Sequence, residues 1–103
     1  MESGCSSCKK SAVMLTTVAM GSHAFAKDTT TKNSAGCTTR TLECDGTTAT
    51  VEVNGGRNGV IGDNGSGMVT VVLTCQPDGT WTTQGIDTPI TQLECSSTDG
   101  GGG

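Results

Sequence analysis

The segment Val69-Thr70-Val71-Val72-Leu73-Thr74-Cys75 carries the strongest secondary-structure signal in the chain. Its β-branched residues favour an extended backbone, and its apolar positions recur at every second residue. In a strand, Val69, Val71, Leu73 and Cys75 therefore face one side. The segment predicts a strand with one face in a hydrophobic core.

The Leu-x-Cys ending of this segment recurs as Leu42-Glu43-Cys44 and as Leu93-Glu94-Cys95. Residues i and i+2 of a strand face the same way, so each leucine is expected to point inward together with its cysteine. We expect three buried half-cystines beside three core leucines, in an arrangement that connects two sheets.

Most of the remaining chain has the character of short strands and tight turns. In the segment 48–54, Ala49, Val51 and Val53 share one face, and the polar residues between them share the other. Asn-Gly and Asp-Gly dipeptides, which tolerate positive φ, separate several of the strand candidates. The sequence predicts an all-β fold, a small antiparallel β-sandwich of the immunoglobulin-like kind, with strands at 12–19, 38–45, 48–54, 59–61, 68–75, 80–84 and 89–95.

The length of 103 residues is that of one domain. We expect a single β domain over 1–98, whose N-terminal arm, strand and long loop occupy 1–36, and a flexible glycine tail over 99–103. Residues 21–36 lack a clear pattern and are expected to form a connection without a strand. Only 32% of the residues are hydrophobic, which predicts a thin core that needs covalent cross-links.

Six cysteines in so short a chain are typical of a disulfide framework formed in an oxidising compartment. We expect three disulfides and an extracellular location, with Cys5 and Cys8 bonded to different partners, while the sequence leaves the pairing open. The Cys5-x-x-Cys8 spacing also suits half of a zinc site or a redox pair, but a second close pair or a βαβ context is missing. No cofactor is expected, and the disulfide cysteines are Cys5, Cys8, Cys37, Cys44, Cys75 and Cys95.

The charge balance is acidic, with a net charge of −4 and a pI near 4.6. The six Lys and Arg residues are scattered, and Phe25 and Trp81 are the only aromatic residues. The chain therefore offers neither a basic footprint nor a stacking platform, and binding to nucleic acid is not expected. Because no apolar run reaches about 18 residues, membrane insertion is not expected either.

The N-terminal region allows two interpretations. Lys9-Lys10 precedes a weakly apolar stretch, and Ala24-Phe25-Ala26 resembles the cleavage site of a secretory signal peptide. Cleavage there would remove Cys5 and Cys8. We favour a retained strand over 12–19, because the stretch is only weakly hydrophobic and lies behind two cysteines.

Residues suited to catalysis are sparse. His23 is the only histidine and lies in an unpatterned segment, where a surface position is expected. The carboxylates are spread singly and not in the close pair that glycosidases use. We expect no catalytic residues and no enzymatic activity. Asn64-Gly65-Ser66 is an N-glycosylation sequon, which makes Asn64 a candidate modification site of a secreted protein.

Together these landmarks resemble the six-cysteine domain of secreted nematode proteins. The matching motifs are Cys5-Ser-Ser-Cys8, Gly36-Cys37-Thr-Thr-Arg-Thr-Leu-Glu-Cys44, Val51-Glu-Val-Asn-Gly-Gly56, Val69-Thr-Val-Val-Leu-Thr-Cys75, Asp78-Gly79-Thr80-Trp81 and Ile90-Thr-Gln-Leu-Glu-Cys95. The resemblance covers residues 5–97 and implies an extracellular location, three disulfides and no established enzymatic role. Residues 75–95 also resemble the end of a sushi module, although the earlier cysteines do not follow that module's pattern.

The expected function is that of a secreted, non-catalytic structural protein whose partners are copies of itself. The predicted strand over 12–19 is joined to the body by a long loop. Its face formed by Val13, Leu15, Thr17 and Ala19 is therefore a candidate for exchange with a neighbouring subunit, which would build a filament. The alternative is a monomeric secreted module that binds an extracellular protein or glycan through the loops at 21–36 or 55–67.

Overall fold

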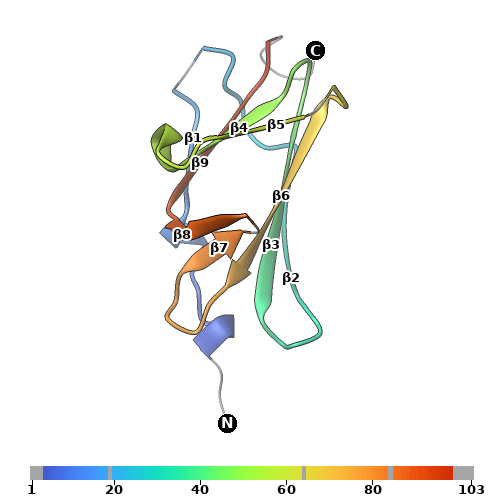
Figure 1. The fold of residues 1–103 in the computed structure, drawn as a ribbon. Coiled ribbons are helices and arrows are strands. Elements are labelled where there is room, and N and C mark those ends of the chain that lie inside the picture. Colours follow the sequence, from blue (N-terminus) through green and yellow to red (C-terminus); the bar gives the residue numbers. More distant parts are fainter. Residues whose placement is uncertain (1–3, 19, 64, 84, 99–103) are drawn as a thin grey trace.

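A computed structural model of the chain shows a β-sandwich built from two sheets (Figure 1). The structure describes residues 4–18, 20–63, 65–83 and 85–98. One sheet has four strands in the order β1-β9-β4-β5, and the other has five strands in the order β2-β3-β6-β7-β8. The predicted all-β sandwich is confirmed. The proposed tail at 99–103 lies outside the described residues.

The described part of the chain contains nine strands and three short 3-10 turns, joined by loops. The strands are β1 (Met14–Thr16), β2 (Lys27–Lys32), β3 (Thr38–Asp45), β4 (Thr50–Val53), β5 (Val60–Gly62), β6 (Met68–Cys75), β7 (Trp81–Thr83), β8 (Ile86–Ile90) and β9 (Gln92–Ser96), and the turns are η1 (Gly4–Ser6), η2 (Lys10–Ala12) and η3 (Asn54–Gly56). In the described ranges, no helix is long and apolar enough to cross a membrane.

The core lies between β3 and β6 of one sheet and β4 and β9 of the other. Strands β3 and β6 pair antiparallel from Thr39 opposite Thr74 to Asp45 opposite Met68, with Leu42 opposite Val71 and Cys44 opposite Val69. All three leucines of the Leu-x-Cys motifs are fully buried, as are their cysteines. The inward orientation expected for this motif is confirmed, and each buried aliphatic side chain contributes about 1.5–3 kcal/mol.

The expectation that 21–36 holds no strand is wrong. Residues Lys27–Lys32 form β2, which pairs with β3 in an antiparallel register of six residues. Most of its side chains are exposed, because β2 is the edge of the five-stranded sheet. An edge strand with polar side chains on both faces shows no hydrophobic alternation, so the usual pattern was absent.

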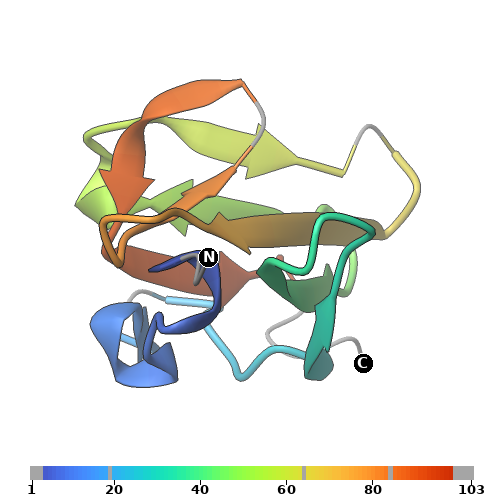
Figure 2. The ribbon, with the colours of Figure 1, turned by 90° about the horizontal axis from the view of Figure 1, so that it is seen from below.

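The strand expected at 12–19 is shorter than predicted and runs in an unexpected direction. Only Met14–Thr16 is a strand, and it pairs parallel with β9, whereas the other strand pairs are antiparallel. Residues 10–12 are taken up by η2, and the chain returns to β9 at Ser22, which bridges Ser96. Figure 2 shows the N-terminal segment beside the last strand.

The single strand expected at 89–95 is divided between the two sheets. Strand β8 belongs to the five-stranded sheet and β9 to the four-stranded sheet, with Thr91 between them. The side chain of Asn54 holds this crossing, because its Oδ1 accepts hydrogen bonds from the backbone N–H groups of Thr91 (2.7 Å) and Gln92 (3.2 Å). Pro89 also lacks an N–H group for a strand ladder.

Candidate functional site

Two disulfides connect the N-terminal arm, defined here as residues 4–18, to the five-stranded sheet. One reaches the residue just before β3, and the other reaches the end of β6, the central strand. Cys5 is bonded to Cys37 with a Cα–Cα distance of 4.9 Å, and Cys8 is bonded to Cys75 with a Cα–Cα distance of 5.8 Å. The expectation that Cys5 and Cys8 have different partners is confirmed. Because no cysteine of the described chain is free, neither a zinc site nor a redox dithiol is formed from this pair.

The third disulfide joins the two sheets. Cys44 on β3 is bonded to Cys95 on β9 with a Cα–Cα distance of 5.5 Å, and both residues are fully buried. This bond confirms the expected link between sheets for two of the three Leu-x-Cys motifs. In the third motif, Cys75 is instead bonded to Cys8 of the N-terminal arm.

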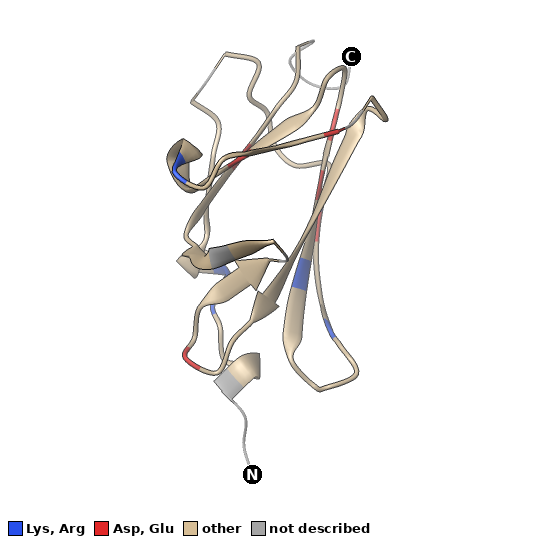
Figure 3. Cartoon of the chain, viewed as in Figure 1, with Lys and Arg blue, Asp and Glu red and all other residues tan. Residues whose placement is uncertain are grey.

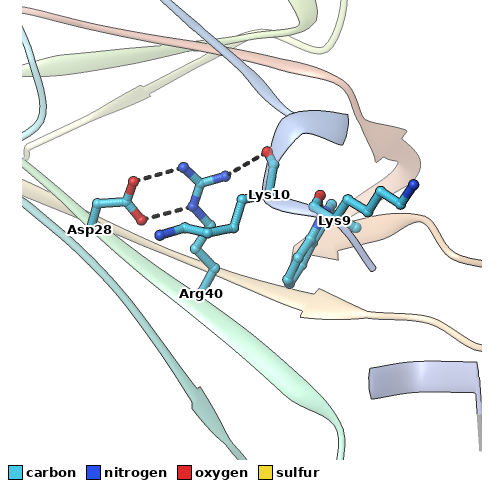
Figure 4. A network of polar contacts seen from close by, with 5 residues as sticks. Lys9, Lys10, Asp28 and Arg40 are labelled. Carbon is cyan, nitrogen blue, oxygen red and sulfur yellow. Dashed lines mark hydrogen bonds and ion pairs between the residues drawn. The ribbon is translucent and has the colours of Figure 1, made fainter. Parts of the chain in front are cut away.

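A buried arginine fixes the arm on the sheet (Figure 4). Arg40 on β3 is 3% exposed and donates two hydrogen bonds to the Asp28 carboxylate, from Nε at 2.8 Å and from Nη2 at 2.7 Å. A third hydrogen bond runs from Nη1 to the backbone oxygen of Lys10 at 3.2 Å. The guanidinium is therefore paired with a carboxylate on one side and caps the η2 turn on the other. This network lowers the pKa of Asp28, chiefly through the hydrogen bond from Arg40.

The arm is also held by the buried indole of Trp81. Its Nε1 donates to the backbone oxygen of Lys9 at 2.9 Å, which satisfies a polar group of a buried aromatic side chain. The backbone carbonyls of two successive residues, Lys9 and Lys10, thus accept hydrogen bonds from two buried side chains of the sandwich. No local sequence pattern predicts these hydrogen bonds, because they join residues that lie far apart in the chain.

The strand residues proposed for exchange differ widely in their environment. Val13 is buried in the core, whereas Leu15 and Thr17 are exposed, and Ala19 lies outside the described residues. The Thr16 hydroxyl donates to the buried Glu94 carboxylate at 2.5 Å. The structure therefore places β1 on its own sandwich, with Val13 just before it in the core and Thr16 as a polar anchor.

The arm residues are integral to the described fold. Cleavage after Ala26, the alternative interpretation of the sequence, would take away Cys5, Cys8 and the buried Val13. Cys37 and Cys75 would then lose their disulfide partners.

His23 is not the simple surface residue that the sequence suggested. It is half-buried, and both ring nitrogens lie 3.7 Å from the Cys95 sulfur, while Nε2 lies 3.2 Å from the Ser97 hydroxyl. His23, Cys44 and Cys95 bring three ligand-type atoms within 4.8 Å of one another. The two sulfur atoms are bonded to each other, so they do not act as thiolate ligands.

A polar groove of about 570 Å³ lies where η3 meets the crossing from β8 to β9. Asn54 supports it from a backbone conformation with φ of 54°, and its Nδ2 donates to Asn58 Oδ1 at 2.6 Å and to the Pro89 oxygen at 3.0 Å. The groove is lined by Asn54, Gly55, Arg57, Asn58, Thr88, Pro89, Thr91 and Gln92. Its amides, hydroxyls and single cation are groups that can bind hydroxyl-rich or anionic ligands, and part of it belongs to the predicted 55–67 loop.

The glycosylation candidate Asn64 lies outside the described residues. Its neighbours form a turn organised by Asp63, whose Oδ1 accepts from Gly65 N at 2.9 Å and whose Oδ2 accepts from Ala49 N and Gly67 N, both at 3.0 Å. These backbone hydrogen bonds, that from Gly65 first, lower the pKa of Asp63.

Charged residues are distributed over several elements (Figure 3). The basic residues of the described chain lie on the arm, on β2 and β3, and just after η3. Arg40 is buried and paired with Asp28, so it contributes little to the outer field.

Two sheets, a disulfide between them and two disulfides to an N-terminal arm define the chain as a disulfide-stapled β-sandwich module. The family model described as the C6 domain matches residues 8–95, and the chain belongs to this family. The six-cysteine resemblance is confirmed, while nematode origin and the sushi-like segment stay predictions. A disulfide-rich C6 domain is typical of extracellular proteins. No curated protein and no solved structure matches the chain significantly.

Proposed function

We propose that this chain is a secreted, non-catalytic structural module that associates with copies of itself in the extracellular space. The observation that carries the proposal is the N-terminal arm. Two disulfides, a buried arginine and a buried tryptophan hold it, and they present β1 as an outer edge of the four-stranded sheet. An edge strand is the natural site for one β protein to add to another.

The absence of enzymatic activity is part of the same proposal. The described carboxylates with a lowered pKa, Asp28, Asp63 and Asp78, are engaged with Arg40, with turn amides and with Thr80. These are the contacts of ion pairs and turns. Each organises the backbone or a neighbouring strand, and the pKa values are shifted away from the neutral range that general acid–base catalysis uses.

The disulfides restrict how β1 can be exchanged between subunits. Cys8 is bonded to Cys75, and the five residues from Cys8 to Val13 span at most about 18 Å when fully extended. A complete exchange of the arm would therefore carry the Cys8–Cys75 and Cys5–Cys37 bonds into the neighbouring subunit. We favour association with the arm retained on its own sandwich.

Two observations on the oxidised protein test the proposal. Negative-stain electron microscopy is expected to show assemblies larger than single domains. Non-reducing electrophoresis in SDS is expected to return them to monomers, since the contacts between subunits are not covalent. An SDS-resistant ladder that collapses on reduction would instead show exchange of the disulfide-linked arm.

The second candidate function is that of a monomeric binding module. The polar groove beside Asn54 favours it, because Arg57, Asn58 and Gln92 converge there with two threonines. An extracellular glycan or an acidic peptide is the class of ligand that such groups recognise. Discrete single domains at high protein concentration would favour this function over self-association.

A further inference from the structure

A concentrated patch of apolar side chains lies on and just after β1. Within seven positions of the chain, Met14 is 62%, Val18 86% and Met20 100% exposed, and Leu15 is partly exposed beside them. Single exposed apolar residues are ordinary on protein surfaces, but four of them within so short a segment make this segment a candidate for contact with another molecule. We call Met14, Leu15, Val18 and Met20 the β1 patch.

A groove with apolar walls lies at the opposite edge of the same sheet. It has a volume of about 520 Å³ and runs between β5 of the four-stranded sheet and β6 to β8 of the other sheet. The half-buried Ile61 and Ile86 line it together with Val71 and Val72, and its remaining lining residues are the neutral Asn58, Thr70, Thr83 and Gly85. We call this the β5 groove.

We propose that the β1 patch of one copy of this chain docks in the β5 groove of the next copy. The inference rests on the proposed self-association and names the surfaces that perform it. Strands β1 and β5 are the two ends of the sheet order β1-β9-β4-β5, so the patch and the groove lie on opposite edges of one molecule. A contact between different surfaces leaves a free patch at one end and a free groove at the other, and such contacts build open chains when the rotation between copies does not close a ring.

The two free strand edges favour a second copy as the occupant, and the charge pattern permits it. Every copy carries a net charge of −4, so two copies repel unless they meet through neutral surfaces. The β1 patch and the β5 groove contain no acidic or basic side chain among their described residues. A basic partner would instead be drawn to the acidic surface elsewhere on the sandwich.

Strands β1 and β5 also match in length, at three residues each, and in the described structure each leaves one side of its backbone without a neighbouring strand. Placing β1 of one copy beside β5 of the next continues the sheet from molecule to molecule. Val18 and Met20, which follow β1, then supply the apolar side chains that enter the groove beside Ile61. The Cys8–Cys75 bond stays within each subunit throughout.

Three lysine variants test the contact by size-exclusion chromatography with light scattering. Met20→Lys alters the patch and Ile61→Lys alters the groove, with Ile86→Lys as a second groove variant if the first misfolds. Met68→Lys is the matched control, because Met68 is exposed but belongs to neither surface. Each patch or groove variant is expected to raise the dissociation constant for self-association about tenfold or more, and the control to leave it unchanged.

Mixing the two variants gives the sharper result. The Met20→Lys copy keeps an intact groove and the Ile61→Lys copy keeps an intact patch, so the mixture is expected to form a 1:1 heterodimer and nothing larger. Unaltered self-association of either folded variant, or a mixture without heterodimer, overturns the assigned surfaces while self-association itself stands. A wild-type chain that stays monomeric overturns the proposed function together with this inference.

Discussion

The indole nitrogen of Trp81 donates a 2.9 Å hydrogen bond to the carbonyl oxygen of Lys9, which precedes it by 72 residues. This bond joins the beginning of the chain to a strand near its end and lies close to the Cys8–Cys75 disulfide in sequence. It shows that the arm is part of the folded sandwich.

The hydrogen bond itself can be tested with Trp81→Phe. The phenyl ring keeps much of the buried apolar surface but leaves the Lys9 carbonyl without this donor, which is expected to lower the free energy of unfolding by about 1–3 kcal/mol. Urea unfolding followed by circular dichroism measures the change. An unchanged midpoint and slope would show that the bond does not hold the arm.

The Arg40 network predicts a larger loss than an exposed ion pair. Arg40→Met removes three hydrogen bonds and leaves Asp28 without its partner, so the free energy of unfolding is expected to fall by about 2–3 kcal/mol. Lys27→Met is the control, because the Lys27 and Glu43 side chains meet at 4.0 Å on the surface. Its expected cost is below about 1 kcal/mol. Equal losses in the two variants would contradict the account.

The pKa of Asp28 makes stability depend on acidity. Because Arg40 holds the folded-state pKa of Asp28 below its unfolded value of 3.8, the stabilisation is present above pH 3.8 and is lost as the pH falls toward the folded-state pKa. Asp28→Asn should therefore flatten the acid limb of an unfolding curve measured against pH. Asp63 and Asp78 also have lowered pKa values, so part of the limb should persist. An acid limb unchanged in Asp28→Asn would rule out this role.

The crossing from β8 to β9 depends on both the side chain and the backbone of Asn54. Asn54→Gly keeps access to the positive φ of 54° but loses the hydrogen bonds to Thr91 and Gln92, with an expected cost of about 1–3 kcal/mol. Asn54→Ala loses the same bonds and adds about 1–2 kcal/mol for the left-handed backbone. Thermal unfolding should rank the wild type above the glycine variant and the glycine variant above the alanine variant. Equal stability of the two variants would exclude the backbone contribution.

The Cys8–Cys75 disulfide is expected to be the main covalent anchor of β1. Replacing both cysteines by serine frees an arm that is tied over 67 positions of the chain, with an expected loss of about 2–5 kcal/mol. Amide hydrogen exchange should quicken in β1 before it does in β3 or β6. Exchange that stays slow in β1 would show that Trp81 and Arg40 suffice to hold the arm.

The parts of the fold that were predictable are those with a local signal. Strand β6 has apolar residues at every second position and β3 ends on the alternating Leu42-Glu43-Cys44, and both strands match the predicted bounds. The Leu-x-Cys motif placed three leucines and three cysteines in the core because side chains in a strand alternate with a period of two. These elements needed no knowledge of distant residues.

The parts that escaped prediction depend on partners far away in the chain. Strand β2 is stabilised by its register with β3 and by the Asp28–Arg40 pair, and its own sequence shows no apolar face. The change of sheet at Thr91 is imposed by Asn54, and the place of His23 against Cys95 by the return of the chain at Ser22. The disulfide pairing was likewise not predictable, because sequence spacing does not determine which cysteine is bonded to Cys8.

Sedimentation equilibrium of the fully oxidised chain over a wide range of concentrations tests self-association most directly. The account predicts a weight-average mass that rises steadily above the 10.3 kDa of one chain as the concentration increases, without a plateau at a closed oligomer. A mass that stays at 10.3 kDa throughout would contradict the structural role and assign the chain to the monomeric binding modules.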